Sequence, residues 1–465
     1  MVDPRRPRAD GSDVLDALAR SLPSAALLTD RDVMESYRRD QAALPGAGMP
    51  LAVVRPRLAA EVQTTLRIAS AGGVPVVPRG AGSGLSGGAN AVDGGLVLSL
   101  TAMDRVLQID RANLLAVVEP GVINGDLSAA AAERGLWYPP DPASAGFSSI
   151  GGNIATNAGG LCCAKYGVTR DSVLGLQVVL ADGSLIRTGG RTVKRVAGYD
   201  LTGLFVGSEG TLGVVTEATL RLRPAPPPPA TLVAFFGDLK SAGTAIAEIT
   251  SEVVPSVLEL MDRHTVRAVD EWKHMDLDLD AAAMLIGRSD AGGEQAANQI
   301  ERMARACTSA GATLVARSSD PMEADLLMNA RRLALPALER QGTILLDDVA
   351  VPIGRITELF EAIERIAADH AVVIGTFGHA GDGNMHPTLV YDHRDPEHVA
   401  RARAAFQDIL RAAVDLGGTI TGEHGVGLLK RPWLTEELGD DGFRVHAAVK
   451  HALDPEGILN PGKVL

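Results

Sequence analysis

The sequence predicts an α+β fold of two domains, and three observations carry that prediction. The chain has 465 residues, 46% of them hydrophobic, so it is long enough to bury more than one core. The run PAPPPP, from Pro224 to Pro229, fits neither a helix nor the interior of a sheet and therefore marks a stiff connector. Short strands and helices precede this connector, and alternating strands and helices follow it.

The first domain, residues 1–225, is expected to consist of many short elements. Apolar residues at helical spacing predict a helix over 13–21 that ends before Pro23. A βαβ unit follows, with strands at 51–56 and 74–80 around a helix at 59–73. The remaining predictions are strands at 94–100, 114–121 and 213–224, a helix at 125–135, and a hairpin at 174–189 that turns at Asp182-Gly183.

The second domain, residues 226–430, is expected to be an α/β cap domain with an antiparallel sheet. Its predicted strands lie at 231–238, 255–262, 281–290, 312–319, 344–352 and 371–379. Its predicted helices begin at Leu239 or lie near 263–273, 293–311 and 355–370. A C-terminal tail, residues 431–465, is expected to be helical near 441–452 and to return to the first domain.

Composition narrows the class of partner. The formal net charge of -13 disfavours nucleic acid and anionic membrane surfaces, because both attract clustered Lys and Arg. The chain has no run of the roughly 18 apolar residues that a membrane helix needs, and no apolar segment follows the N-terminal arginines as in a signal peptide. We therefore expect a cytoplasmic protein, with Cys162, Cys163 and Cys307 as reduced thiols.

The densest glycine loop is PRGAGSGLSGGAN, from Pro78 to Asn90. It contains GxGxxG at Gly82, Gly84 and Gly87, the spacing of a dinucleotide-binding fingerprint. That fingerprint must open a helix, whereas this loop leads into the strand predicted at 94–100, so the context argues against a Rossmann site. Consecutive glycines expose backbone N–H groups that bind anions, which favours a phosphate cradle; a plain hairpin turn is the alternative.

Two further glycine loops lie in the same domain. The segment from Ser148 to Asp171 carries glycine pairs at 151–152 and 159–160, and its Asn153, Thr156 and Asn157 are suited to bind a heterocycle or ribose. The segment from Gly203 to Pro224 is a third glycine-rich turn that leads into a strand. The loop from Ser148 to Asp171 alone predicts a structural turn, but three glycine-rich loops in one domain indicate a large ligand that lies along them.

The second domain contains GHAGDGNMHP, from Gly378 to Pro387, and GEHGVG follows from Gly422 to Gly427. We expect the first stretch to be a turn-forming segment that carries both of its histidines. Together with Glu423, His379 and His386 make a ligand set that suits Zn²⁺ or Mn²⁺. The alternative is that the two histidines are partly buried and satisfied by protein partners.

The ordered set of these motifs resembles a known superfamily. PRGAGSGLSGGA, GGNIATNAGG, YGVTRDSVLGLQVVLADG and VGSEGTLGVVTEATLRL are similar to the flavin-binding domain of the vanillyl-alcohol oxidase/p-cresol methylhydroxylase (PCMH) superfamily. GHAGDGNMHP, GEHGVG and DPEGILNPGK resemble its D-2-hydroxyacid dehydrogenase branch, which includes D-lactate and D-2-hydroxyglutarate dehydrogenases and the flavin subunit of glycolate oxidase. The resemblance runs from about Tyr37 to the C-terminus and implies a PCMH-type FAD-binding domain followed by a cap domain.

The resemblance implies FAD with its pyrophosphate over residues 79–85. Some relatives attach FAD covalently through a histidine in this loop, and Ser83 holds the matching position here, so we expect a non-covalent flavin. The expected cofactor-binding residues are Pro78, Arg79, Gly80, Ala81, Gly82, Ser83, Gly84, Leu85, Gly151, Gly152, Asn157, Gly159, Gly160, Gly167, Asp171, Gly210, Thr211, Gly213, Val215 and Asn460.

The resemblance also implies roles in the second half. His424 matches the base that takes the substrate hydroxyl proton while the C2 hydrogen leaves as hydride to flavin N5. Arg331 matches the arginine that binds the substrate carboxylate, with Arg332 as a nearby rival and a solvated helix charge as the alternative. Asp382 is expected to form a turn or support a histidine, and Asn384 to face the substrate.

One departure from the family pattern bears on the substrate. Hydroxyglutarate enzymes bring a further basic residue to a position where Leu346 and Asp347 stand here, which favours D-lactate, glycolate or a similar monocarboxylate. The expected electron acceptor is a quinone, a cytochrome, an electron-transfer flavoprotein or an iron-sulfur subunit rather than NAD, and a homodimer is left open. The alternatives are a D-2-hydroxyglutarate dehydrogenase, the flavin subunit of a multi-subunit glycolate oxidase, a flavin-dependent alkyl-dihydroxyacetone-phosphate synthase, or a non-catalytic flavin carrier.

Overall fold

A computed structural model of the chain describes residues 11–42, 44, 46–318 and 320–465. The chain divides into two compact units: unit 1 comprises 1–159, 168–225 and 423–465, and unit 2 comprises 160–167 and 226–422. The sequence-based division assigned residues 160–167 to the first domain and residues 423–430 to the second. In the structure, residues 160–167 belong to unit 2 and residues 423–430 belong to unit 1. The N-terminal arginines, for which we expected no signal peptide, lie outside the described residues.

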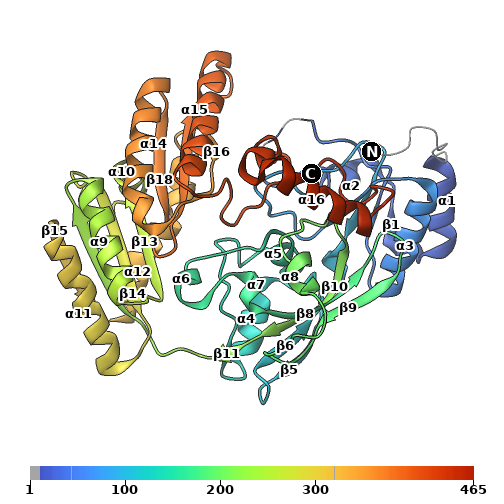
Figure 1. Cartoon of the computed structure of the whole chain (residues 1–465), viewed down its shortest axis with the longest axis horizontal. Coiled ribbons are helices and arrows are strands. Elements are labelled where there is room, and N and C mark those ends of the chain that lie inside the picture. The colour runs from blue at the N-terminus through green and yellow to red at the C-terminus, as the bar shows by residue number, and fades with distance from the viewer. Residues whose placement is uncertain (1–10, 43, 45, 319) are drawn as a thin grey trace. The chain divides into compact units, whose positions relative to one another are not determined.

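Unit 1 is built on two sheets among its described residues (Figure 1). The four-stranded sheet has the order β1-β2-β4-β3, in which β2 and β3 both run parallel to β4. The five-stranded sheet has the order β5-β6-β10-β8-β9 and is antiparallel throughout. Strands β7 and β11 form a separate pair.

The strands of unit 1 are β1 (Leu27–Leu28), β2 (Ala52–Val54), β3 (Val76–Arg79), β4 (Leu96–Ser99), β5 (Val106–Asp110), β6 (Leu115–Val118), β7 (Leu136–Trp137), β8 (Val173–Val179), β9 (Leu185–Gly189), β10 (Val214–Arg221) and β11 (Arg223–Pro224). Its α-helices are α1 (Gly11–Ser21), α2 (Arg31–Glu35), α3 (Ala59–Gly72), α4 (Asn124–Ala132), α5 (Ile150–Thr156), α7 (Thr169–Ser172), α8 (Leu201–Phe205) and α16 (Leu434–Leu453). Short 3₁₀ turns lie at Ser24–Ala26, Leu100–Ala102 and Arg431–Trp433.

The C-terminal segment is part of the unit 1 core. The N–H of Val76 donates to the carbonyl of Ile458 over 2.8 Å, and the N–H of Asn460 donates back to the carbonyl of Val76 over 2.8 Å. Leu459 therefore lies parallel to β3 and is fully buried beside the apolar face of α3. Burying a leucine of this kind stabilises a fold by roughly 1.5–3 kcal/mol.

Unit 2 is organised around an eight-stranded sheet among its described residues, with the order β15-β12-β14-β13-β18-β19-β16 and with β17 also paired to β19. Every pairing in it is antiparallel, as the sequence predicted. The strands are β12 (Ala230–Phe236), β13 (Val257–Asp262), β14 (Ala283–Ser289), β15 (Ala312–Ser318), β16 (Thr343–Leu346), β17 (Val349–Ala350), β18 (Val373–His379) and β19 (Asn384–Tyr391).

The helices of unit 2 cover both faces of this sheet. They are α6 (Cys163–Tyr166), α9 (Leu239–Glu252), α10 (Arg263–Lys273), α11 (Gly293–Ser309), α12 (Pro321–Arg332), α13 (Ala334–Glu339), α14 (Ile356–His370) and α15 (Pro396–Asp415), with a 3₁₀ turn at Ile353–Arg355. On β13, Met261 packs with the helices α10, α12 and α13, whereas Leu258 lies on the side of α11, beside Gly287. Because side chains alternate along a strand, these helices lie on opposite faces.

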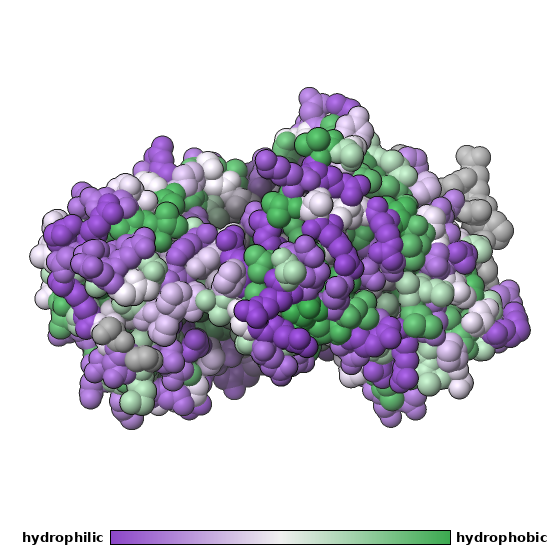
Figure 2. All heavy atoms as spheres, turned by 90° about the horizontal axis from the view of Figure 1, so that it is seen from below, coloured by the Kyte–Doolittle hydropathy of each residue, from purple (hydrophilic) through white to green (hydrophobic). Residues whose placement is uncertain are grey.

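No helix in the described part of the chain is both long enough and apolar enough to cross a membrane. Hydrophilic residues, in purple, occupy much of the face shown in Figure 2, and hydrophobic residues, in green, lie scattered among them. Scattered apolar residues of this kind are ordinary on a protein surface.

Candidate functional site

The two histidines of GHAGDGNMHP lie on a β-hairpin. His379 ends β18, in agreement with the strand predicted at 371–379, and residues 380–383 form the turn. His386 lies inside β19, so the turn is shorter than expected and ends before the second histidine. In the ladder Phe377 faces His386 and His379 faces Asn384, which places both histidines on one face of the sheet. Their ring centroids are 5.2 Å apart, and each offers a nitrogen within 4.8 Å of one on the other.

A glutamate that the sequence analysis missed lies beside these histidines. Glu259, in the middle of β13, is paired with His379 of β18 in the ladder and is fully buried. Its Oε1 lies 2.7 Å from His379 Nδ1. A carboxylate can only accept, so Nδ1 carries the proton and Nε2 is the nitrogen that would bind a metal.

Arg331, the expected carboxylate-binding residue, also contacts Glu259. Its Nε donates to Glu259 Oε2 over 2.6 Å, and its guanidinium lies over the ring of Phe377 at 4.7 Å from the centroid. Arg331 is buried, whereas its neighbour Arg332, the rival in the sequence analysis, is exposed. The helix α12 therefore brings one arginine onto the histidine-bearing face of the sheet and turns the next one away.

A second buried carboxylate, also missed from the sequence, joins the hairpin to the chain before Glu423. Asp348 Oδ1 accepts from Asn384 Nδ2 over 2.8 Å and lies 3.7 Å from His386 Nδ1, while Oδ2 accepts from the Thr421 hydroxyl over 2.8 Å. The N–H of Gly422 donates to the carbonyl of Asp348 over 3.2 Å. The amide nitrogen of Asn384, which we expected to face the substrate, is bound to Asp348 instead.

The remaining predicted residues of this region have local roles. Asp382 Oδ1 accepts the N–H of Asn384 over 3.2 Å, which is the bond of a turn-forming residue. Asp347, which stands where a second basic residue was sought, is fully buried, and its N–H donates to the carbonyl of Pro387 over 2.9 Å. Leu346 is half-buried at the end of β16.

In unit 1, the first glycine loop lies against the start of α5. The N–H of Ala81 donates to the Ser149 hydroxyl over 3.2 Å, and a Cβ on Gly80 would come within 2.3 Å of that hydroxyl. Gly82 has a φ of +77°, and a Cβ there would meet the guanidinium of Arg79 at 2.1 Å. Arg79 is itself fixed by donation from Nη2 to the carbonyl of Arg39 over 2.9 Å. The glycines are thus required where the loop turns back on its own arginine and on α5.

The loop has the character of an anion cradle. Within the described residues, the N–H groups of Gly82, Ser83, Gly84 and Leu85 donate to no other protein group, so they face a ligand or solvent. The strand β3 leads into the loop and the loop leads into β4 without an intervening helix, as expected from the sequence. Backbone N–H groups exposed in this way suit the phosphates of a nucleotide cofactor.

The third glycine loop and the C-terminal tail meet the same cradle. A Cβ on Gly210 would lie 3.1 Å from Pro78, which brings the 208–213 turn onto the base of the first loop. Asn460 Nδ2 donates to the carbonyls of Gly88 (2.9 Å) and Glu209 (2.8 Å), so the tail joins the two loops. The Oδ1 of Asn460 is buried, has no hydrogen-bond partner among the residues that the structure describes, and offers an acceptor to a ligand.

Glu209, which the sequence analysis did not single out, is buried at the centre of this arrangement. Its two oxygens accept the N–H groups of Val426 (2.7 Å) and Gly427 (2.9 Å), which belong to the GEHGVG stretch. Burial raises the pKa of Glu209 to about 7, against the opposing effect of the two N–H groups. Burial likewise raises the pKa of Asp40, beside Gly84, to about 6.

Other expected cofactor residues have structural roles in the described part of the chain. Asn157 ends α5 with a φ of +54°, and its Oδ1 accepts the N–H of Arg170 over 2.9 Å. Asp171 accepts the N–H of Val168 over 2.9 Å at the start of α7. Gly151 lies against Pro120, and a Cβ on Gly213 would be 2.5 Å from Val178. Thr211 donates to the carbonyl of Ser208, and Gly152, Gly159 and Val215 belong to unit 1.

Gly160 and Gly167 belong to unit 2, in the segment that carries α6, and not to the cradle unit. His424, the expected base, belongs to unit 1. The Ser86 hydroxyl donates to its carbonyl over 3.1 Å, and its Nε2 lies 3.7 Å from Glu423 Oε1. Its side chain is 17% exposed.

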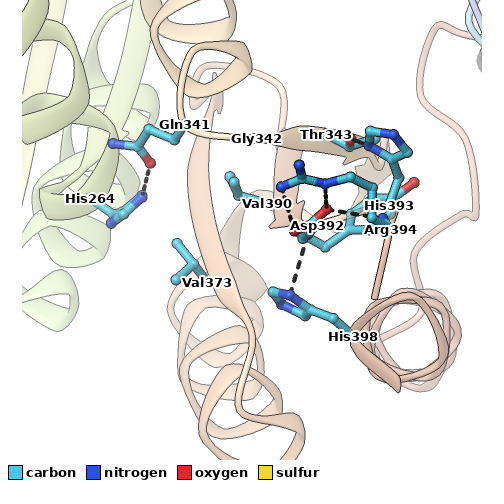
Figure 3. A pocket seen from close by; sticks show the side chains of 11 residues that line it. His264, Gln341, Gly342, Thr343, Val373, Val390, Asp392, His393, Arg394 and His398 are labelled. Carbon is cyan, nitrogen blue, oxygen red and sulfur yellow. Dashed lines mark hydrogen bonds and ion pairs between the residues drawn. The ribbon is translucent and has the colours of Figure 1, made fainter. Parts of the chain in front are cut away.

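Two cavities are lined by none of the residues expected to bind the metal or the substrate, and Asp171 is the one expected cofactor-binding residue in their linings. The first, about 630 Å³ in unit 2, is lined by His264, His393, His398, Asp392 and Arg394 among others (Figure 3). Each imidazole there is held locally: His264 by Gln341, His393 by Thr343, and His398 by the N–H of Asp392. The second, about 420 Å³ in unit 1, is lined by Asp171 and by Arg170, Arg187, Arg195 and Arg221 among others.

The chain matches two protein-family models. Residues 50–189 match an FAD binding domain, and residues 225–464 match the C-terminal domain of FAD linked oxidases. The chain is 46% identical to glycolate oxidase subunit GlcD of Bacillus subtilis, over 90% of this chain and 89% of that protein. It is 37% identical to the subunit of the same name in Escherichia coli, over 99% of this chain and 93% of that protein. It is 34% identical to D-lactate dehydrogenase of Anaerostipes hadrus, over 97% of this chain and 97% of that protein.

Solved structures share the fold at low sequence identity. A structure of p-cresol methylhydroxylase with substrate bound matches with a TM-score of 0.82 and 18% sequence identity. The match covers 97% of this chain and 96% of that chain. A structure of 4-ethylphenol oxidase from Gulosibacter chungangensis matches with a TM-score of 0.79 and 22% sequence identity. The match covers 100% of this chain and 98% of that chain. The prediction of a two-domain α+β fold of the PCMH type is thereby confirmed.

Proposed function

The chain belongs to the FAD-linked oxidases of the p-cresol methylhydroxylase and vanillyl-alcohol oxidase superfamily, and from that membership we propose that it oxidises a D-2-hydroxyacid to the 2-oxoacid. The observation that carries the proposal is the cluster of Arg331, Glu259, His379 and His386 on one face of the unit 2 sheet. It combines a buried guanidinium for a carboxylate with two imidazoles for a metal. The proposed substrates are D-lactate, glycolate or a similar monocarboxylate.

FAD fits the residues of unit 1 and is proposed to bind there non-covalently. The exposed N–H groups of residues 82–85, the close glycine packing at Gly80 and the unpaired Oδ1 of Asn460 support this placement. Ser83 stands at the position of the covalent histidine, and a serine hydroxyl offers no comparable flavin linkage. We therefore expect the flavin to leave the protein on acid precipitation.

A divalent metal, Zn²⁺ or Mn²⁺, is proposed to bind His379 and His386 together with Glu423. Gly422 is held to Asp348, and a Cβ on Gly422 would lie 2.2 Å from the Asn384 amide, next to the histidine hairpin. Glu423 is the following residue, and consecutive Cα atoms are about 3.8 Å apart, so covalent geometry keeps it near these histidines. Two imidazoles and one carboxylate leave a coordination position for substrate.

When bound, FAD would supply an acceptor for the C2 hydrogen as hydride, and a divalent metal would supply a Lewis acid for the substrate hydroxyl. The protein is proposed to supply three things. Arg331, whose Nε is committed to Glu259, presents its two terminal nitrogens to the carboxylate. His424 takes the hydroxyl proton at its imidazole. The buried sheet face excludes water from the reacting carbon.

The electron acceptor is proposed to be a quinone, a cytochrome, an electron-transfer flavoprotein or an iron-sulfur subunit. The relatives named glycolate oxidase subunit GlcD favour a partner subunit as the acceptor. A cytoplasmic location and a homodimer stay predictions.

The proposed function is tested by anaerobic flavin reduction. The purified chain, with its flavin and metal content measured, is mixed with D- and L-2-hydroxyacids while the flavin absorbance is followed. We expect D-lactate or glycolate to bleach the flavin and L-lactate to leave it oxidised. Substitution His424→Ala should slow reduction by about 10²-fold or more with flavin still bound, because a positioned base contributes that much.

The control for this substitution is His446→Ala, an exposed histidine on α16 of the same unit, which should reduce normally. Absence of flavin after reconstitution would refute the central claim. A flavin that no hydroxyacid bleaches would favour the alkyl-dihydroxyacetone-phosphate synthase alternative, which performs no net oxidation. Bleaching without turnover on an artificial acceptor would favour the flavin carrier.

A further inference from the structure

Glu259 is a charged residue in the interior of a central strand. It lies on β13 between Leu258 and Leu260, and none of its surface is exposed. Removing a carboxylate from water costs several kcal/mol unless it is paired and hydrogen-bonded. Its partners must therefore offset that cost, and the two partners that it has among the described residues, Arg331 and His379, both belong to the proposed active site.

The two oxygens of Glu259 are divided between these partners. Oε2 accepts from Arg331 Nε over 2.6 Å, and Oε1 accepts from His379 Nδ1 over 2.7 Å. The hydrogen bond to Arg331 fixes the orientation of the planar guanidinium group, and the hydrogen bond to His379 fixes the tautomer and rotation of the imidazole. A single rigid carboxylate therefore sets the relative positions of the substrate-binding arginine and a metal-binding histidine.

We propose that Glu259 is a positioning residue that holds the carboxylate anchor Arg331 and the metal ligand His379 in register with each other. This inference rests on the proposed function for its substrate part, and on the histidine geometry alone for its metal part. It requires a residue with two acceptors, because both partners approach as donors. Glutamine has one acceptor and one donor, so in Glu259→Gln the amide NH₂ would face either Arg331 or the N–H of His379.

The test uses the full-length flavoprotein and two readouts. The metal-stripped protein is titrated with Zn²⁺ alone, and the KM and kcat for the bleaching hydroxyacid are then measured at saturating Zn²⁺. In Glu259→Gln we expect Zn²⁺ affinity to fall about 10- to 100-fold, as for other partners of metal-bound histidines. We expect KM to rise more than kcat falls, because Arg331 holds a part of the substrate that does not react.

The chain offers a matched control in Glu119. This glutamate is also buried and also paired with an arginine, since Arg105 Nε and Nη2 donate to it over 3.1 and 2.7 Å, but it lies in unit 1 outside the cradle. Glu119→Gln should change stability without changing Zn²⁺ affinity or KM. Glu259→Gln matching Glu119→Gln in both readouts would overturn the inference.

The two proposals fail in different ways. If no hydroxyacid reduces the wild-type flavin, the proposed function is wrong, while loss of Zn²⁺ affinity in Glu259→Gln still supports the positioning of His379. If the wild-type flavin is reduced and Glu259→Gln keeps the Zn²⁺ affinity and the KM of the wild type, the positioning role is wrong. If Glu259→Gln does not fold, the same measurements are made on Glu259→Asp, with Glu119→Asp as its control. Aspartate keeps both acceptor oxygens, but its side chain is one methylene shorter and holds them farther from the two partners. Unchanged affinity and KM in Glu259→Asp would then overturn the inference.

Discussion

Glu209 shows how far burial can shift one residue. Its backbone lies in the left-handed region at a φ of +50°, its side chain is buried, and its pKa is raised to about 7 by that burial. A carboxyl group whose pKa is higher in the folded than in the unfolded chain stabilises the fold below its unfolded pKa. That contribution is lost as pH rises from about 4.5 through about 7.

The first residue-scale prediction concerns this pH dependence. The contribution of Glu209 is on the order of 3 kcal/mol at low pH, from about 1.4 kcal/mol per pKa unit. The melting temperature of the wild type should therefore fall between pH 5 and pH 8, and Glu209→Gln should flatten that fall. Melting curves at four pH values check it, with Glu217→Gln, the partner of Arg187 in the same unit, as control. Parallel curves for wild type and Glu209→Gln would show that Glu209 is already ionised when folded.

Glu259 and Asp348 show what single-sequence reasoning misses at this scale. Glu259 stands in VLELMD, whose apolar pattern predicts a strand but does not say which ladder partner a buried glutamate meets. Its partner His379 is 120 positions away, and only the pairing of β13 with β18 joins them. The histidines, by contrast, were found because two of them occur close together among glycines, a local signal.

The hairpin of β18 and β19 is the element that places both histidines. The sequence analysis recognised the glycines as a turn and predicted the strand that ends at His379. It did not recognise β19, because NMHPTLVY contains a proline and three polar residues that weaken a strand prediction. It also did not predict α15. The segment forms the strand β19 because it is hydrogen-bonded on both sides, to β18 on one side and to β16 and β17 on the other, and these contacts outweigh its weak strand propensity.

The turn of this hairpin depends on Gly383, which has a φ of +87°. A Cβ there would come within 2.1 Å of the carbonyl of Val351, whose N–H donates to the carbonyl of Gly383 over 3.1 Å. Gly383→Ala should destabilise the protein by about 2 kcal/mol or more and reduce Zn²⁺ affinity, since His379 and His386 flank the turn. Gly354→Ala, with no neighbour within 4 Å, is the control. Equal denaturation midpoints for the two variants would contradict this role of the turn.

The molecule consists of two units whose segments alternate along the sequence. Unit 1 is assembled from three separate stretches of chain, and unit 2 from two. The proline connector and the order of elements could be read from the sequence, but the exchange of 160–167 and 423–430 could not, because it depends on which core each short segment packs against.

The prediction at this scale separates the two cores. Leu459 is fully buried beside β3, so Leu459→Asp should disrupt unit 1 and abolish flavin binding. We expect limited proteolysis of this variant to leave a resistant fragment close to residues 226–422, since that stretch holds the eight strands of unit 2. Leu107→Asp, at a half-exposed position of β5, should keep its flavin. Digestion of both units together would show that they unfold as one.

The C-terminal segment beside β3 has a consequence for synthesis on the ribosome. Residues 160–422 contain every segment of unit 2, whereas unit 1 lacks residues 423–465 until those have been translated. The half of the protein that is made first is therefore completed last, which reverses the usual order in which N-terminal domains fold ahead of later ones. The glycine cradle is therefore synthesised before Leu459 and Asn460, which contact β3 and two of its loops in the folded protein.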